Sequence, residues 1–472
     1  MFPDDSAGRG SARLERSCAP GALRRTGIMR DKSLAKLAFA LFLLTTATLF
    51  LRPAELFIWL ADMPIYEVLI LGTLALTFQS VLGHFRQFML TRQPISLCVL
   101  GVFVAIGISH FQYIYVGGVI DSGTLFLKTL IYFGLLVTVV NTPSRLRMFL
   151  LTVAICASTM VTLCVLDFHE IYDFEFIEHL DDTEGFDEDE EVLITVRRMR
   201  GTGIFQDPND LTAVICATGI LCSYFLTDPS LSRLRLAWLI PMAVLLIGML
   251  DTGSRGGLLA CGLAGMTLVA VRYGGKVAIV AAVMAACLIP FAAGRGADIS
   301  LEEGGTGQER IQLWRDGFQE LKSPALLFGT GQGSYADIAG LVAHNSFIHA
   351  YVELGLFGGT MFFGCFFFAG MQLYRMGRLS EPVLHFDLIR MRPFICALLA
   401  GWVTSIMSLS RCYVVPTYLV LGIVASYLNL VWIYTESGEP LVIWDRGHTV
   451  RLGFASATAF SGLYIFTAIM AR

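Results

Sequence analysis

The chain of 472 residues is long enough for about three ordinary soluble domains, but its composition excludes that organisation. Hydrophobic residues make up 55% of the sequence and charged residues only 15%, and the mean hydropathy is +0.66. Soluble domains carry about 25% charged residues, so this chain cannot cover itself with polar surface in water. The formal net charge of −4 is too small to indicate a nucleic-acid partner. The composition predicts an integral membrane protein and excludes a disordered chain, a small disulfide scaffold and a soluble enzyme with a membrane tail.

Apolar segments recur along almost the whole sequence, and about thirteen of them approach the ~20 residues that a helix needs to cross a hydrocarbon core. They are 34–51, 64–82, 95–110, 121–140, 146–166, 208–226, 235–250, 255–271, 276–293, 353–374, 393–410, 413–433 and 452–470. The pattern predicts an all-α integral membrane protein with about 12–13 transmembrane helices. The last segment is rich in Ala, Ser, Thr and Gly, so whether it crosses stays open.

Basic residues predict the orientation, because cytoplasmic loops carry an excess of Lys and Arg. The tail 1–36 holds eight basic and four acidic residues, so we expect it in the cytoplasm. The later basic groups then fall on the same side, at Arg86/Arg92, Arg145/Arg147, Arg233/Arg235, Arg272/Lys276 and Arg375/Arg378/Arg390/Arg392. No A-x-A cleavage site follows the first apolar run, so a cleaved signal peptide is not expected, and Met29 is an alternative start.

Two segments on the predicted external side are too long to be simple turns. The first contains an acidic run at 173–191, which we interpret as a solvated loop in preference to a divalent-cation site. The second contains 309–322, for which the spacing of Ile311, Trp314 and Phe318 predicts an amphipathic helix. The predicted organisation is a basic cytoplasmic tail (1–33), N-terminal transmembrane helices (34–166), a periplasmic loop (167–207), central transmembrane helices (208–293), a large periplasmic loop (294–352) and C-terminal transmembrane helices (353–472).

Arginines on the external side break the charge bias that sets the orientation. Arg200, Arg255 and Arg310 are the candidates for binding phosphate, because the guanidinium fork matches phosphate oxygens and the membrane face suits a lipid pyrophosphate. Arg315 and Arg411 are weaker candidates. The alternative is that these side chains reach lipid headgroups or pair with a local acid such as Asp251.

The segment AHNSFIHAYVELGLFGG at 343–359 is the other candidate for chemistry. Asn345 or Ser346 can cap a helix on which His349 and Glu353 share a face. His344 then lies at the helix entrance, where a histidine can act as a general base near neutral pH or simply satisfy backbone groups. The HxxxxH spacing is not the HExxH spacing of zinc sites, and the eleven cysteines form no CxxC pair, so no metal site is predicted.

Four segments together resemble the O-antigen ligase/polymerase superfamily of polytopic glycosyltransferases. RRMRGTGIFQDPNDLTA resembles the family's Arg, G-x-F and P-N segment, and TGSRGGLLA resembles its S-R-G turn. ERIQLWRDGFQELKSPALLFGTGQGSY resembles the R-x-x-x-W stretch of the large loop, and HNSFIHAYVELGLFGG resembles the closing H-N and E-x-G-x-x-G signature. The resemblance covers about 195–375 in the family's order. One departure is the acidic run before the first matched segment, where the family's loop is basic.

The resemblance implies a fold similar to the C-type glycosyltransferases and an inverting transfer from an undecaprenyl-pyrophosphate-linked glycan to an acceptor hydroxyl. His344 would activate the hydroxyl, Glu353 would orient the His344 helix or the acceptor, and Arg200 and Arg255 would hold the pyrophosphate. Arg310 is a further pyrophosphate candidate, with Asn209, Asn345 and His349 as supporting residues. No nucleotide, metal or other cofactor is implied, because pyrophosphate is already a good leaving group.

Within the family, a ligase acting on lipid A–core, a polymerase acting on a lipid-linked repeat and a protein O-oligosaccharyltransferase share this signature. The expected location is the bacterial inner membrane, in contact with membrane lipids and with the site facing the periplasm. The alternative class is a flippase or transporter of lipid-linked oligosaccharide. That class predicts ionisable residues along a pathway inside the spans, which are nearly free of them, and often internal repeats, which the sequence lacks.

Overall fold

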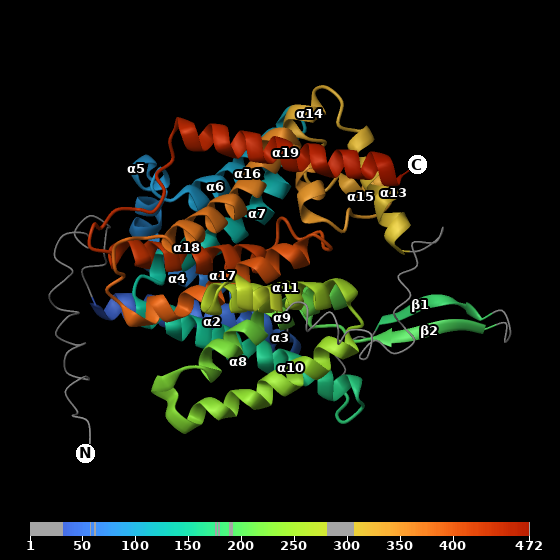
Figure 1. The fold of residues 1–472 in the computed structure, drawn as a ribbon. Helices are drawn as coiled ribbons and strands as arrows, with labels where there is room; N and C mark the ends of the chain where they lie inside the picture. The colour runs from blue at the N-terminus through green and yellow to red at the C-terminus, as the bar shows by residue number, and fades with distance from the viewer. Residues whose placement is uncertain are drawn as a thin grey trace, which may run out of the picture.

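The computed structural model describes residues 32–56, 58–60, 63–174, 177, 180–187, 192–280 and 306–471. Helices packed side by side make up most of this part of the chain (Figure 1). Eleven of the described helices are long and apolar enough to cross a membrane. The prediction of an all-α membrane protein is therefore confirmed. Most of the predicted span 276–293 lies outside the described residues.

The long helices follow the predicted spans closely. They are α2 (Lys32–Leu51), α4 (Ile65–His84), α6 (Pro94–Phe111), α7 (Val116–Val139), α8 (Pro143–Phe168), α9 (Pro208–Leu226), α10 (Leu239–Asp251), α11 (Arg255–Tyr273), α16 (Ser346–Met376), α17 (Phe386–Ile406), α18 (Val415–Ile433) and α19 (Arg446–Met470). Shorter elements connect them: α3 (Pro53–Leu56), η1 (Ile58–Leu60), α5 (Gln87–Leu90), η2 (Gly203–Phe205), η3 (Pro229–Trp238), α13 (Thr306–Gln319), α14 (Ala325–Phe328) and α15 (Tyr335–Ala339). Helix α19 is continuous over the segment 452–470 that the sequence left open.

Proline and small polar residues determine where several helices begin. Pro143 and Pro208 are first helical residues, where the missing N–H has no helical partner to lose. The preceding Thr142 and Asp207 cap these helices: the Thr142 hydroxyl accepts from the N–H of Arg145 at 3.2 Å, and the Asp207 carboxylate accepts from the N–H of Asn209 at 2.7 Å. The DPND sequence therefore fixes the first residue of α9.

Helix α18 is the most buried of the candidate spans, and the spans that contain α10, α11 and α19 are the least buried. Tyr418 and Tyr427 on α18 are fully buried. Large apolar side chains on α10, α11 and α19, including Leu246, Leu259 and Phe454, are more than half exposed. Exposed apolar side chains on peripheral helices are expected where lipid covers them in place of water.

The loops gather at two opposite ends of the helices. One end, here called the hairpin end, holds α13, α15, the β-hairpin and the last turn of α19 (Figure 1). Hydrogen bonds between loops define it: Gln112 Nε2 donates to the carbonyl of Gly329, and Met199 N–H donates to the carbonyl of Asp251 at 3.0 Å. The opposite end is joined by a bond from the N–H of Trp444 to the carbonyl of Thr91 at 2.6 Å.

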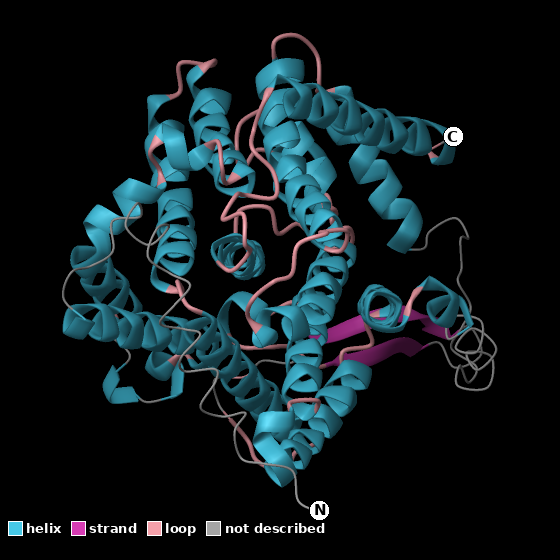
Figure 2. Ribbon diagram, turned by 60° about the vertical axis from the view of Figure 1, so that its left-hand side comes forward, coloured by secondary structure: helices cyan, strands magenta, loops and turns pink. Residues whose placement is uncertain are grey.

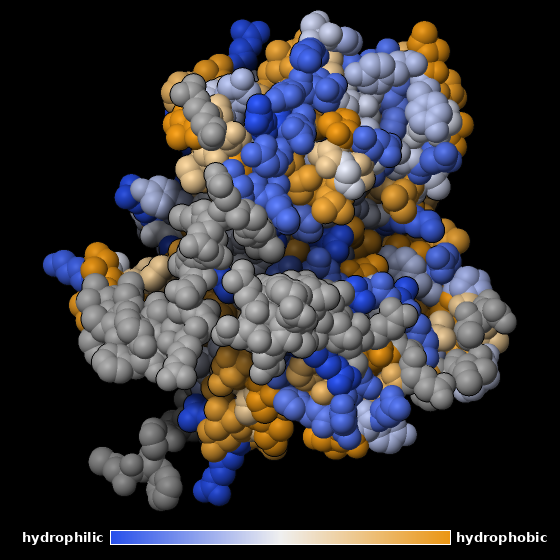
Figure 3. Space-filling view, turned by 90° about the vertical axis from the view of Figure 1, so that its right-hand side faces the viewer, coloured by the Kyte–Doolittle hydropathy of each residue, from blue (hydrophilic) through white to orange (hydrophobic). Residues whose placement is uncertain are grey.

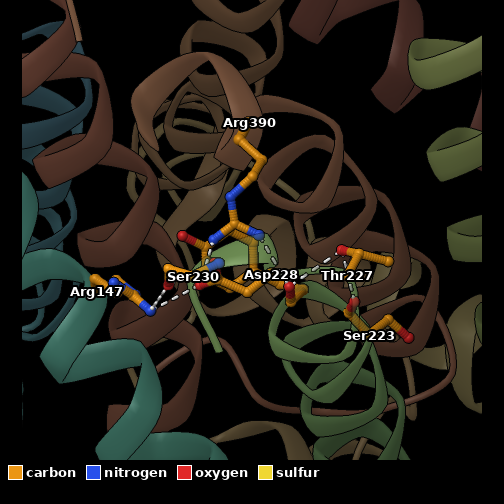
Figure 4. Close-up of polar contacts among 7 residues, drawn as sticks. Arg147, Ser223, Thr227, Asp228, Ser230 and Arg390 are labelled. Atoms are coloured by element: carbon orange, nitrogen blue, oxygen red, sulfur yellow. Dashed lines mark hydrogen bonds and ion pairs between the residues drawn. The ribbon is translucent and has the colours of Figure 1, made fainter. Parts of the chain in front are cut away.

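Asp228 clamps three helices together at the opposite end (Figure 4). Its carboxylate is buried and lies 2.8 Å from guanidinium nitrogens of Arg147 on α8 and Arg390 on α17. Ser230 also donates to it, through both its backbone N–H and its hydroxyl. The Arg390 guanidinium lies 3.8 Å from the centre of the Tyr224 ring, which adds a cation–π contact.

The segment 167–207, predicted to be external, contains a β-hairpin that the hydropathy pattern did not predict. Strand β1 (Leu180–Asp187) pairs antiparallel with β2 (Val192–Arg198), with Asp181 opposite Arg197 in the register. The hairpin projects sideways beyond the helices in Figure 1, and in Figure 2 its two strands lie side by side behind helices. The β-branched residues of VLITV favour a strand. Part of the acidic run 173–191 therefore belongs to a strand, at 180–187.

Candidate active site

The predicted amphipathic helix of the second external segment is confirmed as α13. Ile311 and Phe318 on this helix are buried, and the Phe318 ring contacts the rings of Phe460 and Tyr464 on α19. A hydrogen bond also joins α13 to the residues before α16: the indole nitrogen of Trp314 donates to the carbonyl of Ala343 at 2.6 Å. Helix α13 is thus held between the last long helix and the start of α16.

Asn345 caps α16 as the sequence predicts. Its side-chain oxygen accepts from the N–H groups of Phe347 and Ile348 at 3.0 and 3.2 Å. His349 and Glu353 share a helix face, with His349 Nε2 3.0 Å from Glu353 Oε1. His344 is half-buried immediately before the cap and has a φ of 47°, a left-handed conformation that histidine adopts more readily than most residues.

Glu353 is a buried anchor and is not open to solvent. Its exposed fraction is 1%, and the same Oε1 accepts from the backbone N–H of Tyr335 at 3.0 Å. Two further bonds join this loop to α16: the N–H groups of Thr330 and Gly331 donate to the carbonyls of Val352 and Glu353 at 3.0 and 3.1 Å. The contacts assign Glu353 to holding the GTGQGSY loop against α16.

Helix α16 is interrupted at Gly355, close to the carbonyls of Val352 and Glu353 that accept these hydrogen bonds. Gly355 has a φ of 66°, and a Cβ at this position would lie 2.4 Å from the backbone of Leu327 and Phe328. Only glycine allows both the left-handed backbone and the close approach of α14. The break divides α16 into an outer segment that carries His349 and Glu353 and a longer segment that runs through the bundle.

The P-N segment and the S-R-G turn are in direct contact. Ser254 caps α11 by accepting from the N–H of Gly257, and its hydroxyl donates to Asn209 Oδ1 at 2.6 Å. A Cβ on Gly257 would lie 1.8 Å from Thr212 Cγ2, so a side chain there would force α11 away from α9. Arg255, the first residue of α11, therefore lies beside the start of α9.

The loop between α17 and α18 connects this pair of segments to the start of α16. The Arg411 guanidinium makes two hydrogen bonds to the carboxylate of Asp210, in the first turn of α9. The Ser346 hydroxyl accepts from the N–H of Arg411 at 2.8 Å and donates to the carbonyl of Leu409 at 2.6 Å. The four segments that resemble the family thus meet at the hairpin end.

The predicted site arginines differ in their surroundings. Arg200 is half-buried, and its Nε is enclosed without a hydrogen-bond partner among the described residues. Arg255 is exposed, and Asp251, offered above as an example of a local acid, lies 3.0 Å from His169. Arg310 is half-buried on α13, one turn before Trp314. Arg315 is exposed and lies 3.5 Å from the carbonyl of Ala471, near the end of α19.

His344 lies in a predominantly positive environment. Burial lowers its pKa from the ordinary value of 6.5, and the charges of Arg310, Arg411 and His349 lower it further, while Asp207 opposes them. Burial opposes the charge of Arg411 as well, but the hydrogen bond and charge of Asp210 outweigh it and raise the pKa of that guanidinium. The lowered pKa favours the neutral form of the His344 imidazole at pH 7.

Figure 3 looks onto the hairpin end and shows hydrophilic side chains, interspersed with apolar ones, over the upper part of this face and in an indentation below it. Within the described ranges, no group of three or more His, Cys, Asp or Glu side chains is arranged to hold a metal ion.

One comparison with known proteins gives a match. Residues 240–363 match a family model described as O-antigen ligase, and this match supports the O-antigen ligase/polymerase superfamily. The matched stretch includes Arg255, α13, His344 and Glu353, and it begins after Arg200 and Asn209. No curated protein matches the chain significantly. The match supports glycosyl transfer of the O-antigen ligase/polymerase type in broad terms, with a lipid-linked glycan donor and a glycan acceptor, by a multi-pass membrane protein.

Two residues of this site were missed by sequence reasoning. Asp207 was not singled out, although an acidic residue before Pro208 is typical of a helix cap. Asp210 was also missed, although an acid in the first turn of a membrane helix is costly unless a cation pairs with it. Arg411, ranked below the other arginines, is that partner.

Proposed function

We propose that this protein, which resembles O-antigen ligases over residues 240–363, is an inverting glycosyltransferase that uses an undecaprenyl-pyrophosphate-linked glycan as donor and an acceptor hydroxyl on the periplasmic side of the bacterial inner membrane. The observation that carries the proposal is the half-buried His344, with a lowered pKa, at the end where the segments bearing Arg200, Arg255 and Arg310 meet. A neutral base beside several arginines matches a reaction in which a hydroxyl loses a proton while a pyrophosphate departs.

In the proposed reaction the acceptor oxygen attacks the anomeric carbon while its proton passes to the imidazole of His344. The bond from the anomeric carbon to the phosphate oxygen breaks, and its electron pair leaves with the pyrophosphate. Arg200, Arg255 and Arg310 would stabilise the charge that develops on the leaving group. Because attack and departure occur on opposite faces of the sugar, the configuration inverts.

The remaining predicted residues take supporting roles in this proposal. Asn345 holds the first turn of α16, and Asn209 joins α9 to the S-R-G turn through Ser254. Glu353 and His349 are positioning residues, because both are buried and their carboxylate–imidazole pair also binds the backbone of Tyr335. They would act through the position of the His344 turn and not by contact with the substrate.

The proposed orientation places the N-terminal tail in the cytoplasm. Its support is that the basic loops, including Arg86, Arg147 and Arg378, follow helix ends at the end of the bundle opposite the hairpin end. The hairpin end would then face the periplasm.

The test is deletion of the gene and complementation with wild type, His344→Ala, Arg200→Gln or Arg255→Gln. Lipid-linked and surface glycans are analysed by gel electrophoresis and mass spectrometry, with protein levels measured in the membrane fraction. We expect each variant to reproduce the deletion phenotype at normal protein level. Wild-type glycans in the His344→Ala strain would refute the assignment of the base.

The glycan that accumulates separates the activities. Long polymer on the lipid carrier, with bare acceptor, identifies a ligase. Single repeat units on the carrier identify a polymerase, and loss of glycan from a periplasmic protein identifies a protein O-glycosyltransferase. Donor confined to the cytoplasmic leaflet would instead indicate a flippase and contradict the proposed transferase.

A further inference from the structure

Arg411 makes two independent contacts with the segments around His344. Its side chain binds Asp210 at two points, with Nε donating to Oδ1 at 2.6 Å and Nη2 donating to Oδ2. Its backbone N–H donates to the hydroxyl of Ser346, two residues after His344. One residue therefore joins the first turn of α9 to the first turn of α16.

The ion pair buries one of its two charged groups. Asp210 is only 4% exposed, whereas the Arg411 side chain is 34% exposed. Removing a carboxylate from water costs free energy that its attraction to a guanidinium only partly offsets. The two-point contact of Nε and Nη2 with this buried carboxylate therefore favours a role beyond packing.

We propose that the Asp210–Arg411 pair is a positioning element of the active site that aligns His344 with the α9 segment and sets the charge beside the imidazole. The proposal rests on the proposed function, because it assumes that His344 is the base. Arg411 acts through Ser346 on the backbone of the His344 turn, and its orientation is fixed by the two-point contact with Asp210.

The proposal predicts the direction in which each charge moves the pKa of His344. Four charged or titratable groups face His344: Arg310 from α13, Arg411 from the α17–α18 loop, His349 from α16 and Asp207 before α9. Removal of the Arg411 charge makes protonation of His344 easier and raises its pKa. Removal of the Asp210 charge leaves Arg411 uncompensated and lowers the pKa of His344 further.

A matched control exists at the other end of the bundle. Asp228 and Arg390 form a buried carboxylate–guanidinium pair between the end of α9 and α17 at 2.8 Å (Figure 4). This pair resembles Asp210–Arg411 in chemistry and in its attachment to α9, although Asp228 also pairs with Arg147, and it lies at the other end of α9 from Asp210. A purely structural role predicts that the two pairs respond alike to substitution.

The experiment measures kcat, KM and the pH profile of full-length protein in lipid nanodiscs. The donor is the lipid-linked glycan isolated from the deletion strain. The variants are Arg411→Lys, Arg411→Gln, Asp210→Asn, Asp228→Asn and His344→Gln, and thermal unfolding of each shows that it is folded.

We expect Arg411→Lys to lower kcat about 10- to 100-fold with little change in donor KM, because lysine keeps the charge but loses the two-point alignment. The acidic limb of the profile should move up by roughly half a pH unit in Arg411→Gln and down in Asp210→Asn, the size expected for one partly screened charge. Asp228→Asn should lower the unfolding temperature and leave the midpoint of the acidic limb of the pH profile unchanged.

Full kcat in Arg411→Lys, or limbs that stay at the wild-type pH in both Arg411→Gln and Asp210→Asn, would overturn the proposal. If Arg411→Gln does not fold, the kcat of Arg411→Lys and the pH profile of Asp210→Asn still test the proposal. Wild-type kcat in His344→Gln would instead refute the proposed base, so the two failures are distinguishable.

Discussion

Trp314 donates a hydrogen bond from its indole nitrogen to the carbonyl of Ala343, the residue before His344, at 2.6 Å. Arg310 lies one helical turn earlier on the same face of α13. The helix that carries a candidate pyrophosphate ligand is therefore fixed directly to the turn that carries the candidate base. The aromatic contacts of Phe318 with α19 hold the other side of α13.

Replacing Trp314 by Phe should loosen this connection while keeping most of the apolar contact. A lost hydrogen bond of about 1 kcal/mol corresponds to roughly a fivefold effect on the population of the aligned state. We expect kcat to fall by at least about that factor with an unchanged unfolding temperature of the helix bundle. Phe466→Leu on α19, whose ring also contacts Trp314, is the control, and an equal loss of kcat there would assign the effect to packing alone.

The pH dependence of transfer should show the lowered pKa of His344. The pKa of His344 lies below the ordinary histidine value of 6.5. The rate should therefore fall as the pH drops through a midpoint below 6.5, because the protonated imidazole cannot accept a proton. In Arg310→Gln a positive neighbour is lost, so the pKa rises and the limb moves to higher pH. In Asp207→Asn a negative neighbour is lost, so the limb moves to lower pH, while asparagine can still cap α9.

These two shifts have opposite signs and are measured from initial rates between pH 4.5 and 8. Shifts in the same direction in both variants would contradict the electrostatic assignment of the limb to His344.

Gly355→Ala should be one of the most damaging single substitutions in α16. The added methyl group meets backbone atoms of α14 at a left-handed position, where both strain and steric overlap act. We expect a destabilisation of more than about 2 kcal/mol, seen as reduced protein level and a lower unfolding temperature. Gly370→Ala in the same helix is the control, because a Cβ there meets nothing within 4 Å and alanine favours helix. Equal behaviour of the two variants would refute the packing of α14 at the break.

Substitution of Glu353 separates a buried anchor from a residue that contacts substrate. Glu353→Gln keeps the shape and one acceptor oxygen but removes the charge that pairs with His349. We expect a loss of about 1–3 kcal/mol in unfolding free energy and a fall in kcat, with acceptor KM unchanged. A selective rise in acceptor KM at wild-type stability would show instead that Glu353 contacts the acceptor.

Several features of the protein follow from the sequence alone, because they depend on local periodicity and helix chemistry. The length and hydropathy of the apolar runs determine the long helices, and the residues DPND and HNS determine where α9 and α16 begin. The spacing of Ile311, Trp314 and Phe318 likewise gives α13. The four segments that resemble the family also predict which residues belong to the candidate site.

Only the tertiary structure determines which polar groups neutralise one another. Arg411 and Asp210 are about two hundred positions apart, so no local pattern relates them, yet they form the ion pair that joins α9 to the start of α16. Glu353 is a catalytic candidate from the sequence, and its burial against the N–H of Tyr335 supports the proposed positioning role. Burial and charge compensation depend on contacts between distant segments, and for that reason the pKa of His344 was decided by the fold and not by its sequence neighbours.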